Sequence, residues 1–73
     1  MNQKEFEDRY YHRVVRIKGE LWPDLRGMTG YVTAALLKHE KTPLIAIWTT
    51  GGEWNTFNLD PDLSELSEFE ILR

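Results

Sequence analysis

Apolar and polar residues alternate in short runs along most of the chain, a pattern typical of half-buried β-strands. Turn-forming residues separate the runs, with glycine at five positions and proline at three. The segments that we expect to be strands are 13–18, 31–38, 43–49, 53–58 and 69–72. The run 43–49 is almost continuously apolar, so we expect it to be the central strand.

Two local patterns predict how these strands are oriented and joined. In the segment 31–38 the period of two predicts that alternate side chains face the core. The inward set is Val32, Ala34 and Leu36, and the outward set is Tyr31, Thr33 and Ala35. Gly51-Gly52 predicts a two-residue hairpin turn, because paired glycines tolerate the positive φ angles that such turns require.

The two ends of the chain are less regular. Residues 60–68 predict a single helical turn, with Asp60 as its cap and Pro61 at its first position. Residues 1–12 have no strand period and are too short to be stable as an isolated helix. We therefore predict a charged N-terminal arm over 1–12, which either docks on the rest or orders on a partner, and one domain over 13–73.

Five short strands with a helical turn before the last one predict a mainly β fold, a small five-stranded SH3-like barrel. Closure would remove most of the strand edge that a flat sheet leaves exposed. The alternative is a twisted antiparallel sheet with residues 60–68 forming a longer helix across it.

Composition excludes several classes of protein. The chain of 73 residues is long enough for one small core, and without cysteine it has no disulfide or thiolate metal site, which suits the reducing cytoplasm. No apolar run approaches the roughly 20 residues of a membrane span. The net charge is −3, and residues 53–73 hold six acidic side chains against Arg73, which argues against direct nucleic-acid binding.

Residues suited to catalysis are scarce. His12 and His39 are the only histidines, the residue type most often used as a general base, and they fall in the arm and in a predicted turn. Neither has a second ligand at helical spacing, and Gly27 and Gly30 are not followed by a phosphate-binding lysine. We expect no enzyme activity, no cofactor and no metal.

The aromatic residues are the best candidates for binding a partner, since tryptophan, tyrosine and arginine are enriched at interface hot spots. Trp22 precedes a proline in a loop, where it either caps one end of the barrel or meets a partner. Trp48 and Ile47 are neighbours, so one of the two faces outward. The predicted contact residues are Phe6, Arg9, Tyr10, Tyr11, Arg13, Trp22 and Trp54.

The stretch VVRIKGELWPDLRGMTGYV, with Gly27, Gly30 and Val32 as a G-x-x-G-x-V element, resembles the start of KOW-type barrels. The later EWNTFNLDPDLSEL and FEIL are similar to the end of the photosystem I subunit IV family and of a ferredoxin-docking subunit of the photosynthetic NDH complex. These resemblances imply an SH3-like fold. They also provide the alternative function, an accessory subunit of a photosynthetic electron-transfer complex.

The length, the cysteine-free acidic composition and the charged arm before the barrel resemble small phage regulators that bind host bacterial RNA polymerase. That resemblance implies a protein that inhibits initiation by displacing the σ factor and acts in antitermination. It also implies a host cytoplasmic location. No heptad pattern or long exposed strand predicts pairing between copies, so we expect a monomer.

Overall fold

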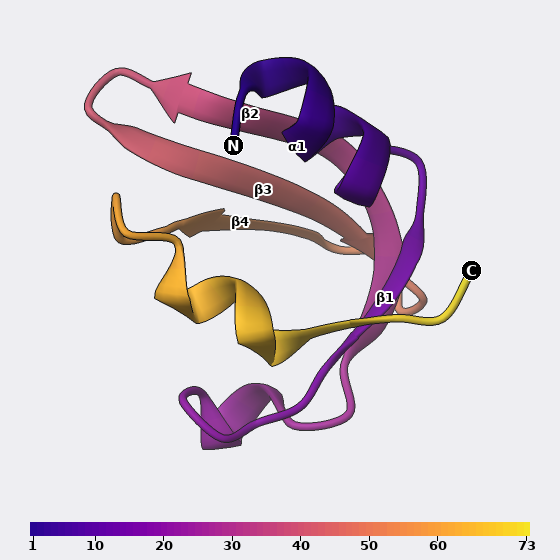
Figure 1. Ribbon diagram of the computed structural model, residues 1–73. Helices are drawn as coiled ribbons and strands as arrows, with labels where there is room; N and C mark the ends of the chain where they lie inside the picture. The colour runs from indigo at the N-terminus through magenta and orange to yellow at the C-terminus, as the bar shows by residue number, and fades with distance from the viewer.

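All five segments expected to be strands form strands in the computed structural model, which describes residues 1–73 and is mainly β (Figure 1). An α-helix precedes them, and two short 3-10 helices lie in the connections. In chain order the elements are α1 (Gln3–Tyr10), β1 (Val14–Ile17), η1 (Pro23–Leu25), β2 (Thr29–His39), β3 (Thr42–Thr49), β4 (Trp54–Asn58), η2 (Ser64–Glu68) and β5 (Phe69–Ile71). No helix is both long enough and apolar enough to cross a membrane.

The strands form one antiparallel sheet in the order β4-β3-β2-β1-β5. The last strand returns to the first, so that Val15 faces Ile71 and Ile17 faces Phe69. β4 pairs with β3 alone, and no hydrogen-bonded pairs join it to β5. The sheet is therefore not closed, and the predicted barrel is confirmed only as far as a single five-stranded antiparallel sheet.

The core lies on one face of this sheet, and every strand contributes at least one buried side chain to it. Its largest fully buried members include Phe6, Ile17, Ile45, Ile47 and Leu59. The apolar run 43–49 supplies Ile45 and Ile47 to this core. It forms an interior strand between β4 and β2, but the middle strand of the sheet is β2 rather than the predicted 43–49.

β2 contains a bulge that the alternating pattern did not predict. Val32 faces Ile47 and Ala34 faces Ala46, so Thr33 is an extra residue without a partner on β3. Beyond the bulge the alternation is reversed: Ala35 is buried and Leu36 is exposed. The predicted inward set was therefore right for Val32 and wrong for Leu36, because one inserted residue moves every later side chain to the opposite face.

The turn between β3 and β4 is also longer than predicted. The Thr49 N–H donates to the Glu53 carbonyl at 2.9 Å, and the Gly52 N–H donates to the Thr49 carbonyl at 3.0 Å. These bonds enclose three residues, and only Gly52 has a positive φ, at 81°. The loop is thus a three-residue turn rather than the two-residue turn expected for Gly51-Gly52.

The helical turn before β5 begins at Ser64, not at Pro61. Leu63 precedes it in the left-handed conformation with φ 63°, and the Asp62 carboxylate accepts from the Ser64 N–H at 2.9 Å. The Asp60 N–H instead donates to Glu65 Oε1 at 2.7 Å. Asp62, rather than Asp60, is therefore the side chain that satisfies a free N–H at the start of η2.

The N-terminal arm is helical and is part of the packed structure. Asn2 and Glu5 form a reciprocal capping box at the start of α1. Figure 1 shows α1 alongside β2. The Gln3 side chain donates to the Ala35 carbonyl at 2.9 Å and accepts from the Leu37 N–H at 2.6 Å. It thereby occupies the edge of β2 that β1 leaves unpaired, since β1 pairs only with Thr29–Tyr31.

A helix too short to be stable alone is thus stabilised by packing against the sheet, which the local pattern did not reveal. Phe6 and Tyr10 lie in the core and contact each other edge to face, with ring centroids 5.4 Å apart. The predicted boundary after residue 12 falls in the turn between α1 and β1, where His12 has a φ of 63°.

Candidate functional site

Three aromatic side chains form a continuous row across the outer face of the sheet. Tyr31 on β2 faces Trp48 on β3, and Trp48 faces Trp54 on β4. Their exposed fractions are 43%, 42% and 61%. The two tryptophan rings meet edge to face with centroids 5.3 Å apart. We call Tyr31, Trp48 and Trp54 the outer aromatic row.

Strand alternation places these rings outside. Ile47 is buried in the core, so its neighbour Trp48 points to the other face, as expected for one member of this pair. On β4 the buried residue is Phe57, and Trp54, three positions earlier, faces solvent. Antiparallel pairing then aligns the rings, which come from three consecutive strands of the chain.

The row continues toward the N-terminus. The His12 ring stacks on Tyr31 with centroids 5.7 Å apart, and Tyr11 stacks on His12 at 3.6 Å. The His12 N–H donates to the Val32 carbonyl at 3.0 Å, which fixes this end of the arm beside β2. Tyr11, a predicted contact residue, is thereby brought next to the outer aromatic row.

The strand segments around the row contain no charged residue. No Asp, Glu, Lys or Arg occurs in residues 29–37, 43–52 or 54–59. Beside the row lie small side chains, because Ala34 faces Ala46 and Ala46 faces Thr56 across the three strands. The outer face is therefore a shallow apolar and aromatic surface. Contiguous apolar patches of this kind mark interaction sites, whereas apolar residues scattered singly over a surface do not.

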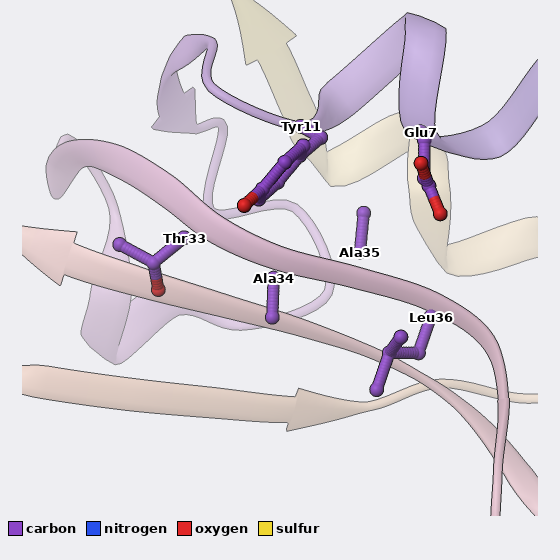
Figure 2. Close-up of a pocket in the computed structure, with 6 residues that line it drawn as sticks. All are labelled: Glu7, Tyr11, Thr33, Ala34, Ala35 and Leu36. Carbon is purple, nitrogen blue, oxygen red and sulfur yellow. The ribbon is translucent and has the colours of Figure 1, made fainter. Parts of the chain in front are cut away.

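Two open hollows adjoin this face. One, of about 290 Å³, lies against Tyr31 and Trp48, with Arg73 among its lining residues. The other, of about 230 Å³, is a groove between α1 and β2 (Figure 2). Figure 2 shows Tyr11, just after the end of α1, above Thr33 and Ala34, and Glu7 on α1 itself. Both are small, and neither encloses a ligand-sized chamber.

Three of the predicted contact aromatics have places in or against the core. The rings of Phe6 and Tyr10 are buried, and burial raises the pKa of the Tyr10 hydroxyl although nearby Arg9 lowers it. Trp22 is half-buried, with its ring stacked on Phe57 at 5.2 Å. Trp22 thus folds back onto core residues, and its role as a partner contact stays a prediction.

The predicted basic contact residues lie on the surface near Tyr11. Arg9 and Arg13 are both exposed, and the Arg13 guanidinium donates to the Asp8 carbonyl at 3.2 Å. Trp54 and Tyr11 are thus the predicted aromatic contacts that reach the outer face. Tyr31 and Trp48 were not among the predicted contacts, because only the pairing of β2 with β3 shows that they stand side by side.

Glu68 is the other residue that the sequence did not single out. Its side chain is fully buried, and its carboxylate accepts from the backbone N–H groups of Gly19, Glu20 and Trp22 at 3.2, 2.8 and 3.3 Å. Burial alone would raise the pKa of this carboxyl, but hydrogen bonds from Leu21, Glu20, Trp22 and Gly19 outweigh it and leave the pKa lowered. Glu68 therefore fastens the loop that carries Trp22 to the end of η2.

The two histidines are separated. His12 belongs to the aromatic stack beside β2, and His39 is the last residue of that strand. No three side chains of His, Asp or Glu gather closely enough to hold a metal ion together.

The chain was compared with protein-family models, with curated proteins and with solved structures, and no match was found in any of the three.

Proposed function

We propose that this protein is a non-enzymatic binding protein that docks on a protein partner through the outer aromatic row. The observation that carries the proposal is the alignment of Tyr31, Trp48 and Trp54 on strand segments without charged residues. Interface cores are depleted of charge and enriched in tryptophan and tyrosine, whose rings provide large contact areas. His12 and Tyr11 extend the row by two further rings from the arm.

We further propose bacterial RNA polymerase as the partner, in the host cytoplasm, with the bound protein acting as a monomer. It would inhibit initiation by covering a surface that the σ factor needs, and it would also act in antitermination. This choice of partner rests on the resemblance to small phage regulators in length, composition and charged arm. The shallow outer face supports it, since a flat apolar surface suits a large protein better than a small ligand.

The connection order supports an SH3-like fold as the finer description, and we propose that the sheet is a partly open barrel of this type. Four strands follow one another as neighbours, a 3-10 turn comes next, and β5 pairs with β1. A superfold of this kind hosts many functions and does not by itself identify a partner.

The photosynthetic subunit remains the second candidate and has less support. Docking an acidic electron carrier needs a free basic face. Arg16 is engaged with Glu70, and the Arg26 guanidinium donates to the Gly19 carbonyl at 3.1 Å. These contacts occupy two of the five cations between residues 9 and 26.

The proposed function is tested by binding to immobilised bacterial RNA polymerase core enzyme. Trp48→Ala is the test variant, because the side chain is 42% exposed and lies outside the core. Leu21→Ala is the matched control, since Leu21 is also an exposed large apolar residue, 54% exposed, but lies in the loop after β1. We expect Trp48→Ala to weaken binding by about 30-fold or more, as for a hot-spot tryptophan, and Leu21→Ala to leave it unchanged.

Added σ factor should compete with the wild-type protein for the core enzyme. Two results would contradict the proposal: no binding of the wild-type protein to the polymerase, or binding that Trp48→Ala and Leu21→Ala affect equally.

A further inference from the structure

The outer edge of β4 carries backbone groups that the chain itself leaves unpaired. The Leu59 N–H donates to the Pro43 carbonyl and the Thr49 N–H donates to the Glu53 carbonyl, both at 2.9 Å. Antiparallel strands alternate between bonded and non-bonded positions, so the intervening residues point their N–H and C=O groups away from β3. These residues are Trp54, Thr56 and Asn58, and none of their backbone groups bonds to another part of the chain.

This edge also lacks the features that usually protect a free strand. Such features are charged side chains, prolines, bulges and very short strands. β4 has five residues, WNTFN, with no charge and no proline, and its pairing with β3 has no register shift. By contrast, β5 at the other edge has three residues, and its Glu70 forms an ion pair with Arg16.

The side chains along the edge are accessible. Trp54, Thr56 and Asn58 are all exposed, whereas Phe57 between them is buried. An added strand would therefore meet both open backbone groups and the last ring of the outer aromatic row.

The surroundings of the edge are acidic. Residues 42–72 contain six acidic side chains and no Lys or Arg. Glu53 immediately precedes β4, and Asp60 follows it by two residues. The only ion pair in the structure joins Arg16 and Glu70, so the carboxylates at both ends of the edge have no cationic partner.

We propose that β4 accepts an extended segment of the protein partner as a sixth strand of the sheet. The backbone of that segment would pair with Trp54, Thr56 and Asn58, in the manner of β-strand addition. Its centre would be uncharged, with apolar side chains on the outer face continuing the outer aromatic row, and lysine or arginine would flank it to meet Glu53 and Asp60. The inference rests on the proposed protein-binding function and adds how the partner is held.

A second copy of this chain is a poorer occupant. Two β4 strands paired about Thr56 in antiparallel register would bring Glu53 of one copy near Leu59 and Asp60 of the other. Like charges at both ends of the pair would oppose such a dimer.

The test uses Thr56→Pro with Thr56→Val as its control. Proline removes the Thr56 N–H, which points away from β3, so the ladder to β3 is kept; prolines occur in edge strands with this orientation. Valine keeps the N–H and has nearly the same shape. Both variants are first checked for the wild-type amide spectrum by NMR.

The probe is the peptide KRVTVTVRK, with EDVTVTVDE as the charge-reversed comparison. We expect the basic peptide to slow hydrogen exchange at the amides of Trp54, Thr56 and Asn58. We also expect Thr56→Pro and the acidic peptide each to reduce affinity by at least about tenfold, and Thr56→Val to leave it unchanged.

The inference would be overturned if the basic peptide did not bind, or if it protected amides other than those of β4. It would also be overturned if both peptides bound with equal affinity, or if Thr56→Pro bound the basic peptide as tightly as the wild type. If the wild-type protein self-associated through the same amides, the sixth strand would come from a second copy of this chain, and the inference of a partner segment would also be overturned. Binding of the same variants to RNA polymerase separates the two proposals. If Trp48→Ala loses the polymerase and Thr56→Pro keeps it, the outer aromatic row is supported and the added strand is not.

Discussion

The two glycines of the G-x-x-G-x-V element have different structural roles. Gly27 has a φ of 83°, in the left-handed region that glycine adopts without strain, and its N–H donates to the Ile17 carbonyl at 2.9 Å. Gly30 lies within β2, where a Cβ would meet Ile47 Cγ2 and would stand 2.6 Å from the Trp48 carbonyl oxygen. The first glycine is needed for backbone conformation and the second for close approach of β3.

Replacing Gly30 by alanine should therefore separate β2 from β3 at the position where the outer aromatic row is paired. We expect Gly30→Ala to lower the free energy of unfolding by about 1–3 kcal/mol, the usual cost of overpacking. Gly51→Ala is the control, because its Cβ would meet only Thr49 Oγ1 at 3.9 Å and its φ is not positive. It should change stability by less than about 0.5 kcal/mol. Urea unfolding of the two variants checks the difference, and equal losses would contradict this account of Gly30.

At the scale of the elements, the sequence predicted the strands well because their signals are local. The turn glycines and the alternating runs lie within a few residues of the strands that they define. The bulge at Thr33 could not be predicted in this way, because it depends on which residues of β3 pair with β2. The docking of α1 depends on Gln3 reaching Ala35 and Leu37, more than thirty residues away.

Glu68 is a similar case, since its partners in the loop after β1 precede it by almost fifty residues. The lowered pKa of its carboxyl means that the folded state favours the ionised form. Its stabilising effect is therefore complete at pH values above the ordinary pKa of 4.5 and is lost as the pH falls through the lower folded-state pKa.

Glu68→Gln should be less stable than the wild type at pH 7, because a neutral amide accepts these N–H groups more weakly. The difference in the free energy of unfolding between the two proteins should shrink as the pH falls below 4.5. Contributions of other carboxylates, including Asp62, are shared by both proteins and cancel. Urea unfolding at several pH values measures this difference; a gap that stays constant down to acid pH would count against the role assigned to Glu68.

At the scale of the whole molecule, α1 and the sheet share one core. Phe6 is fully buried beside Tyr10, and both belong to the same cluster as Val32 and Ile45. The arm is therefore expected to unfold together with the sheet rather than fray before it.

Phe6→Ala should cost about 3–5 kcal/mol, as for other buried phenylalanines. Domains have only about 0.05–0.15 kcal/mol of stability per residue, so the loss should remove a large fraction of the total free energy of unfolding. Lys4→Ala, at an exposed position of the same helix, should have little effect. Loss of helix in Phe6→Ala while tryptophan fluorescence still reports a native sheet would show that the arm is a separate unit.

The candidate site was predicted in part. Trp54 and Tyr11 are among the contact residues predicted from the sequence, and strand alternation predicts that one of Ile47 and Trp48 faces outward. That Tyr31, Trp48 and Trp54 form one row depends on the register of three strands, which no local pattern specifies. Phe6 and Tyr10 were predicted to contact a partner because no local pattern shows that residues 1–12 pack against the sheet.

The pairing of β5 with β1 also affects how the chain folds during synthesis. Until residues 68–71 have left the ribosome, β1 can pair only with β2. The N–H groups of the loop after β1 also lack their acceptor, the Glu68 carboxylate. The native contacts between β1 and β5 thus join residues more than fifty positions apart, and such pairings slow folding because a long loop must close first. A nascent chain that has made its first four strands therefore still exposes Val15 and Ile17 along an open edge, the kind of surface that chaperones bind.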